Sequence, residues 1–332
     1  MRRLTGLGLA LAALGAAAPM PAAAQAPPPH VSVGIGDNSA DLFTDSRFRA
    51  TGIRHARLIV PYDVVRAGGW PLASADAWLG RARELGVEPL VTFAHSDRRP
   101  KYLPKVRQYA ARVREFRLRY PWVREFGTWN EANHGGVQPT GPNPRRTADF
   151  YRELRRQCAR AGCRVVAVEI LAASWKRTWR WMRKFRRRAG PGPHTWGIHN
   201  YPDANRGLFG TTQRFLRAVR KDEIWFTETG GIVRFEKRWR YDENRAARSV
   251  RHVFRLAALS PRITRVYLYN WQSDPRNRRW DSGFMAADGT PRRAFFALLD
   301  GLTLERFRTP PPPVVAIPLP GEPITLGADR DD

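Results

Sequence analysis

Residues 105–131 read KVRQYAARVREFRLRYPWVREFGTWNE, and this stretch contains one complete unit of the pattern that decides the fold. In Lys105–Tyr120 the apolar residues recur at helical spacing, which predicts an amphipathic helix. Val123–Thr128 is a short run with strand-like character, and a glutamate, Glu131, follows three residues later. The unit is therefore a helix, then a strand, then a carboxylate beside the carboxyl end of that strand.

The same alternation of strand and helix runs through most of the chain. Strand-like runs recur about every 33 residues, with helical periodicity between them. Such alternation requires parallel strands joined by right-handed crossovers. Eight units over residues 31–302 match the ~250 residues of a closed barrel. We therefore predict an α/β fold, a single-domain (β/α)8 TIM barrel over residues 27–305. The predicted strands are Val31–Ile35, Ala56–Pro61, Pro89–Phe93, Val123–Thr128, Arg164–Ile170, Trp196–Asn200, Ile224–Thr227 and Ile263–Tyr269.

Two other architectures share parts of this pattern. A helical repeat array can have a similar period, but here each unit opens with a strand and no residue pattern recurs from unit to unit. An open doubly wound sheet also alternates strands with helices. However, the turn over Gly34–Asn38, after the first strand, lacks a complete dinucleotide-binding fingerprint. The closed barrel is the better prediction.

Both ends of the chain differ from this body. Arg2 and Arg3 precede a short apolar run over Leu4–Ala18 and alanine-rich cleavage candidates, which predicts a signal peptide over residues 1–26. An uncleaved membrane anchor is the alternative, but the run is shorter than the ~20 residues of a bilayer span. We expect a secreted, periplasmic or cell-envelope protein with no membrane span after cleavage. We expect a disordered, proline-rich tail over residues 306–332.

Export also bears on the two cysteines of the chain, Cys158 and Cys163. In an oxidising compartment a close pair usually forms a disulfide. Closing so short a loop stabilises the fold by only about 2 kcal/mol, so the expected role is structural. A zinc site would need two further ligands, and no histidine lies nearby in the sequence. We expect a disulfide and no metal site.

The chain is strongly basic, with 57 Lys and Arg residues against 30 Asp and Glu residues and a formal net charge of +27. This charge suggests an anionic partner, such as an acidic glycan at the basic surface. The simpler interpretation is that arginines cover every solvent-facing surface, because they occur along the whole chain. In the helical segment 175–188, an apolar stripe of Trp175, Trp179, Met182 and Phe185 is predicted to face the core, opposite the arginines. Export argues against nucleic acid as a partner.

Two strands lead into glutamates at the position where a barrel carries its catalytic groups. The fourth strand leads into Trp129, Asn130 and Glu131, and the seventh leads into Thr227 and Glu228. A glutamate is disfavoured there by strand propensity and would be partly desolvated, so its presence needs a reason. Paired carboxylates across a cleft are what glycoside hydrolysis requires, one of them a protonated acid and the other ionised.

These motifs resemble those of the retaining glycoside hydrolases of clan A, (β/α)8 enzymes that include cellulase-like and β-xylosidase-like families. The resemblance implies that Glu131 is the general acid/base, that Glu228 is the nucleophile, and that Asn130 binds the sugar 2-hydroxyl. It also implies that Trp129, in the same motif, belongs to the substrate site. The resemblance covers nearly all of the chain after the predicted signal peptide. One departure is Ala132, where β-xylosidase-like families usually carry proline.

Further residues match the clan pattern on the expected strands. Arg57, on the second strand, resembles the arginine that steadies the nucleophile. His199 and Tyr201 resemble the His-x-Tyr pair after the sixth strand. Trp271 resembles the tryptophan after the eighth strand that forms the floor of the sugar subsite. His95, after the third strand, is expected to line the cleft. For each of these residues taken singly, the alternative interpretation is a purely structural role.

Two more carboxylates lie near the same end of the predicted barrel. Glu169, after the fifth strand, contacts substrate or pairs with an arginine, and we favour the ion pair; Asp63 is a similar and weaker candidate. The prediction is a monomeric, exported retaining glycosidase that acts on a β-linked oligo- or polysaccharide and needs no cofactor. The alternative is a non-catalytic barrel that binds an acidic cell-envelope polysaccharide through its arginines. The retained pair of glutamates favours the enzyme.

Overall fold

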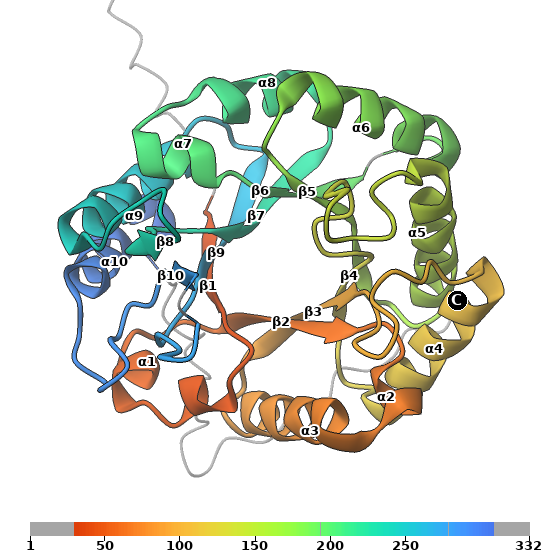
Figure 1. Cartoon of the computed structure of the whole chain (residues 1–332), viewed down its shortest axis with the longest axis horizontal. Helices are drawn as coiled ribbons and strands as arrows, with labels where there is room; N and C mark the ends of the chain where they lie inside the picture. Colours follow the sequence, from red (N-terminus) through yellow and green to blue (C-terminus); the bar gives the residue numbers. More distant parts are fainter. Residues whose placement is uncertain (1–29, 193, 278, 309–332) are drawn as a thin grey trace, which may run out of the picture.

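Eight parallel strands close on themselves in the computed structural model, which describes residues 30–308 except 193 and 278 (Figure 1). Each strand pairs with the next barrel strand along the chain, and the first strand pairs along its whole length with the last. The predicted TIM barrel is confirmed, and every predicted strand end lies within two residues of the observed one. The barrel strands are β1 (Ser32–Gly36), β2 (His55–Pro61), β3 (Glu88–Ala94), β4 (Glu125–Gly127), β5 (Arg164–Leu171), β6 (Thr195–His199), β7 (Glu223–Thr229) and β9 (Ile263–Tyr269).

The helices form a ring around the barrel, as the view down its axis shows (Figure 1). A small antiparallel sheet of β8 (Arg234–Phe235) and β10 (Trp280–Asp281) is built from the segments that follow β7 and β9. No helix of the described part of the chain is long and apolar enough to cross a membrane. The α-helices are α1 (Ser46–Ala50), α2 (Val64–Ala67), α3 (Gly69–Glu84), α4 (Val106–Arg119), α5 (Pro144–Ala159), α6 (Trp175–Ala189), α7 (Tyr201–Arg206), α8 (Gly210–Ala218), α9 (Glu243–Ala257) and α10 (Arg293–Thr303), with 3₁₀ turns at Ala40–Phe43 and Glu305–Phe307.

Helix α4 follows the sequence pattern closely. Its first turn is tied by the side chain of Gln108, which accepts a hydrogen bond from the backbone N–H of Lys105. Tyr109, Val113 and Phe116 are fully buried, as the helical spacing of apolar residues predicts. Burying side chains of this size stabilises the fold by about 1.5–3 kcal/mol each, which fixes the helix against the barrel.

Helix α6 departs from the prediction at its amino-terminal end. Met182 and Phe185 are buried, but Trp179 is 38% exposed and its ring stacks on that of Trp175 at the surface, with ring centroids 6.2 Å apart. The buried stripe runs instead through Thr178, as well as Trp181, before it reaches Met182 and Phe185. The apolar stripe is therefore rotated by about one position relative to the one predicted from the aromatic residues.

The two remaining structural expectations concern the disulfide and the chain ends. Cys158 and Cys163 form the predicted disulfide at the end of α5. The expected tail begins at residue 306, but Phe307 is buried against Phe254, and Arg306 donates hydrogen bonds to two backbone carbonyls. The barrel therefore includes residues 306–308. The predicted signal peptide and the proline-rich segment 309–332 lie outside the described residues.

Candidate active site

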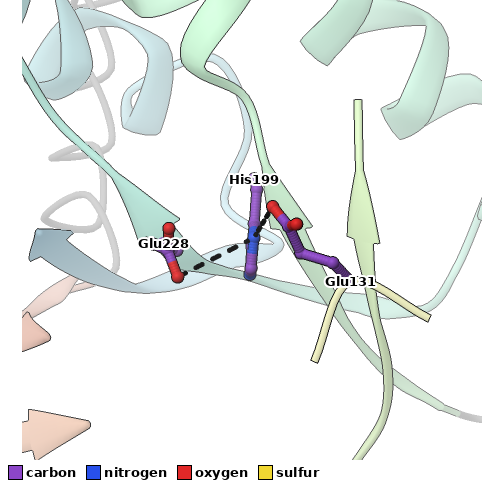
Figure 2. A group of neighbouring side chains, drawn as sticks. All are labelled: Glu131, His199 and Glu228. Carbon is purple, nitrogen blue, oxygen red and sulfur yellow. Dashed lines mark hydrogen bonds and ion pairs between the residues drawn. The ribbon is translucent and has the colours of Figure 1, made fainter. Parts of the chain in front are cut away.

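Two glutamates and a histidine meet at the carboxyl ends of the barrel strands (Figure 2). Glu131 follows β4, His199 ends β6 and Glu228 lies near the end of β7, so three separate strands position the three groups. One carboxylate oxygen of each glutamate and one ring nitrogen of His199 all lie within 4.8 Å of one another. The two glutamates are therefore brought together across the mouth of the barrel, as their strand positions predicted.

The backbone at Glu131 adopts an unusual conformation. Its φ is 42°, in the left-handed region that residues other than glycine rarely occupy. Hydrogen bonds on both sides hold the turn in place, because Asn130 N donates to Phe93 O at 2.8 Å and Ala132 N donates to Glu169 O at 3.0 Å. A proline at position 132 would lack this N–H, which gives a physical reason for the departure at Ala132. Strain of this kind persists where surrounding structure fixes it, often at functional sites.

The carboxylate of Glu228 is held by two side chains from different strands. Arg57 on β2 donates from Nη1 to Oε2 at 2.9 Å, and the Tyr201 hydroxyl donates to Oε1 at 3.1 Å. Both donors are buried, whereas 13% of the Glu228 side chain remains exposed. One oxygen is therefore held by a cation and the other by a hydroxyl, and the carboxylate is oriented with part of its surface open to the cavity.

Arg57 itself belongs to a buried network beneath the two glutamates. Its Nη2 atom donates to Asn130 Oδ1 at 2.8 Å and to Glu169 Oε2 at 2.5 Å. The second oxygen of Glu169 accepts from the Thr92 hydroxyl at 2.6 Å. Burial by itself raises the pKa of Glu169, but the charge of Arg57 and the interaction with His199 lower that pKa to about 2. Glu169 thus forms the ion pair favoured by the sequence and lies below the cavity.

His199 lies between the carboxylates and is fully buried. Its Nδ1 atom is 3.1 Å from Glu131 Oε1 and 3.9 Å from Glu228 Oε2, and Nε2 is 3.5 Å from Glu169 Oε2. Burial by itself lowers the pKa of His199, but the negative charges of Glu228, Glu131 and Glu169 raise it to about 9. Burial likewise raises the pKa of Glu131, while the bond with His199 lowers it. At neutral pH the pair therefore shares one proton, held on His199.

The same three residues contain a donor set that could hold a metal ion. A histidine binds a metal through a neutral ring nitrogen, whereas His199 carries a proton at neutral pH and shares it with Glu131. Glu228 already accepts a hydrogen bond from the cation of Arg57. Arg57 and His199 therefore balance the charges of Glu228 and Glu131 within the described residues. The arrangement fits acid–base chemistry better than a metal centre.

A cavity of about 760 Å³ opens above these groups and is lined by both glutamates, Asn130 and Tyr201. The structure corrects the placement of Trp129 and Trp271. Trp129 is fully buried, and its indole N–H donates to Gln138. Trp271 is 1% exposed, and its indole N–H donates to Asp45. Both indoles therefore belong to the core and neither lines this cavity.

Two other residues from the sequence also lie away from the cavity wall. His95 is half-buried, with Nδ1 3.4 Å from the carbonyl oxygen of Ser96. Asp63 accepts a hydrogen bond from the Ser96 hydroxyl at 2.8 Å. Both Asp63 and His95 therefore contact Ser96, which follows β3, and neither residue lines the cavity.

Apart from Tyr201, the aromatic lining of the cavity comes from residues that the sequence analysis did not identify. Tyr269, the last residue of β9, lines the cavity where Trp271 was expected to do so. Strand alternation was the available signal, because Tyr269 is two residues after Tyr267, which is buried against residues of other barrel strands. A second aromatic group comes from the β8–β10 sheet: Trp280 packs edge-on against both Tyr201, at 4.9 Å, and Phe235, at 5.2 Å. No periodic pattern marks these residues, which lie on two-residue strands.

Comparison with known proteins finds the same fold in solved structures of glycoside hydrolases. No protein-family model and no curated protein matches the sequence. Among solved structures, a GH5_18 protein from Streptomyces cattleya is similar, with a TM-score of 0.58, 15% identity and coverage of 86% of this chain and 83% of that chain. Xylanase 10B from Thermotoga maritima has a TM-score of 0.58 at 11% identity, covering 82% of this chain and 95% of that chain. A GH39 β-xylosidase from Caulobacter crescentus has a TM-score of 0.54 at 18% identity, covering 84% and 72% respectively. At these identities the likeness establishes a shared fold.

Proposed function

We propose that this protein is an exported retaining glycoside hydrolase that acts on a β-linked glycan, with Glu228 as nucleophile and Glu131 as general acid/base. The observation that carries the proposal is the approach of the two carboxylates, which have oxygens within 4.8 Å of each other. Retaining enzymes keep these groups about 5–5.5 Å apart, whereas inverting enzymes need roughly 6.5–9.5 Å to admit a water molecule. The short separation favours direct attack by Glu228.

In the first step, a carboxylate oxygen of Glu228 forms a bond to the anomeric carbon while the glycosidic C–O bond breaks. The bonding electrons leave with the glycosidic oxygen, and Glu131 gives that oxygen a proton. Arg57 and Tyr201 hold the Glu228 carboxylate in line for this attack. The proton that Glu131 donates comes from the pair it forms with His199. This proton moves from Nδ1 of His199 to the Glu131 carboxylate before or during its transfer to the glycosidic oxygen.

In the second step, Glu131 acts as a base. It takes a proton from a water molecule, whose oxygen attacks the anomeric carbon and releases Glu228. The sugar would lie against the aromatic side chains of Tyr269 and Trp280, which offer apolar faces to a pyranose ring. Asn130, held by Arg57 at 2.8 Å, is placed to bind a hydroxyl of the same sugar.

Export remains part of the proposal and rests on sequence features together with the disulfide. Arg2, Arg3 and the apolar run over Leu4–Ala18 have the character of a signal peptide. The disulfide between Cys158 and Cys163 fits an oxidising compartment. Export is tested by fractionating cells that express the full chain and measuring the mass of the protein found outside the cytoplasm. A full-length chain found in the cytoplasm would contradict export.

The proposed activity is tested by a screen of aryl β-glycosides and mixed polysaccharides with the full chain. Glu228→Gln keeps the size of the side chain while removing its nucleophilic carboxylate, and Glu84→Gln, at an exposed position of α3, is the matched control. We expect hydrolysis by the parent protein and the control, and none by Glu228→Gln. No hydrolysis by any folded variant across a broad panel would favour the non-catalytic, polysaccharide-binding barrel.

A further inference from the structure

The cleft continues beyond the catalytic cavity. A second cavity of about 650 Å³ lies between the loop that follows Glu131 and helix α6, and it shares His134, Ser174 and Arg177 with the first. Neither glutamate lines this second cavity. The two cavities are therefore one groove that extends from Glu228 past Glu131, and the second cavity lies on the Glu131 side.

This groove is lined by cations that have no acidic partner. Arg177, Arg180 and Lys184 project from α6 into the second cavity, and Arg206 and Arg238 line the first. Within the described ranges, none of these five side chains forms an ion pair. Of the carboxylates in the described part of the chain, only those of Glu131 and Glu228 line either cavity.

Two other arginines of the same helix form ion pairs. Arg186 approaches Asp222 at 3.8 Å, and Arg188 binds Asp149 at 2.7 Å. Within the described residues, Arg186 and Arg188 thus pair with acids of adjacent elements, whereas the cations that face the groove form no ion pair. Arg183 and Arg187, which line neither cavity, form none either. General arginine enrichment would place unpaired cations anywhere on the surface, but it does not explain a continuous groove that lacks acidic residues apart from the catalytic pair.

We propose that this groove binds an anionic saccharide, with its carboxylate or sulfate groups facing Arg177, Arg180 and Lys184 on the leaving-group side of the cleaved bond. The assignment of the side rests on the proposed function, because Glu131 gives its proton to the leaving oxygen and the second cavity lies beyond Glu131. A neutral glycan would leave these cations without partners. An acidic glycan pairs with them, and a concave, low-dielectric surface strengthens such attraction relative to an open face.

The inference is tested by calorimetric binding to the full chain carrying Glu228→Gln, which prevents turnover. The probes are a β-linked oligoglucuronate, a sulfated cello-oligosaccharide and a neutral cello-oligosaccharide of equal length. The variant Arg180→Gln/Lys184→Gln removes two groove cations. The matched control, Arg183→Gln/Arg187→Gln, removes the same charge from exposed positions of the same helix that line neither cavity.

We expect at least one anionic probe to bind more tightly than the neutral one, with affinity that falls as salt rises. Arg180→Gln/Lys184→Gln should weaken that binding about tenfold, and the control should bind as the parent does. The oligoglucuronate and sulfated arms identify which anionic group the groove accepts. Equal weakening in both double variants, or equal affinity for the neutral probe, would overturn the inference and leave the proposed hydrolysis standing. If anion binding depends on Arg180 and Lys184 but the parent protein hydrolyses no substrate, the inferred anion-binding groove is supported and the proposed hydrolase function is rejected.

Discussion

Arg57 on β2 and Glu169 on β5 bind each other across the interior of the barrel at 2.5 Å, and both side chains are almost completely buried. The same guanidinium reaches upward to Glu228 and Asn130. Glu169 therefore balances the charge of the group that orients the proposed nucleophile, although it does not line the cavity itself. It is a positioning residue, and its effect on the site passes through Arg57.

Glu169→Gln should lower both stability and activity. Glu169→Gln leaves Arg57 with Glu228 as its remaining acidic partner. The loss of the charged hydrogen bond to Glu169 costs about 1.5–3 kcal/mol in free energy of unfolding, measured by urea denaturation. Since Gln keeps the shape of the side chain, a loss of kcat in the folded variant would report altered positioning of Glu228. The exposed Glu84→Gln should change the free energy of unfolding by no more than about 0.5 kcal/mol. Wild-type stability and activity in Glu169→Gln would contradict this role.

Glycines on the neighbouring strands make room for Glu169. A Cβ atom at Gly127 would lie 2.4 Å from the Thr92 hydroxyl and 2.6 Å from Glu169 Oε1. Gly127→Ala should therefore destabilise the protein by about 1–3 kcal/mol and reduce activity, because the buried network must shift. Gly80→Ala is the control, since a Cβ there meets no atom within 4 Å and α3 gains a better helix former. The midpoint temperature of thermal unfolding should fall for Gly127→Ala and rise for Gly80→Ala. Equal shifts in the two variants would refute the explanation.

His199 should set the alkaline limit of activity. Because the surrounding carboxylates raise its pKa to about 9, the proton shared with Glu131 is retained below that pH and lost above it. We expect kcat/KM to fall on the basic side near pH 9. In His199→Gln the proton must reside on Glu131 alone, so the basic limb should move toward lower pH. An unchanged pH profile in a folded, active variant would exclude the shared proton.

His55 should weaken the fold in acid. Burial and the charge of Arg265 lower its pKa to about 3, and Glu88, though 3.5 Å away, is too exposed to oppose them. The unfolded chain takes up this proton below about pH 6.5, while the folded protein does not, so stability is present above that pH and is lost as pH falls toward 3. His55 thus lowers the free energy of unfolding by about 3 kcal/mol when the pH falls from 7 to 4. Urea denaturation of His55→Phe should show a smaller loss over that interval; an identical loss would contradict the assignment.

The barrel and the two glutamates were predictable because both depend on local patterns. Buried parallel strands are short apolar runs with turns between them, so their limits could be set to within two residues. Catalytic groups of a barrel lie at the carboxyl ends of strands, which brings Glu131 and Glu228 together without any knowledge of long-range contacts. His199 also ends its strand, whereas Arg57 lies within β2 and is predicted only from its resemblance to the clan pattern.

The aromatic lining was not predictable in the same way. The prediction of Trp271 rests on its resemblance to the clan's tryptophan after the eighth strand, but Trp271 lies beyond the end of β9 and is buried in the core. Tyr269 ends the strand and lines the cavity instead. Trp280 reaches the cavity through the β8–β10 sheet, whose strands are too short to leave a periodic signal. The predicted core stripe of α6 is wrong at Trp179, because aromatic spacing alone does not distinguish a buried stripe from one rotated toward solvent. Trp175 is partly buried and packs against the core.

The central claim is that Glu228 attacks the anomeric carbon, and covalent trapping tests it most directly. A 2-deoxy-2-fluoro β-glycoside with an activated leaving group, matched to the sugar found in the screen, slows both steps but slows release of the enzyme more. Mass spectrometry of the digested protein should then find one glycosyl group on the peptide that contains Glu228, and none in Glu228→Gln. A label on Glu131 or Glu169, or an active enzyme whose first product has the inverted anomeric configuration, would contradict the account.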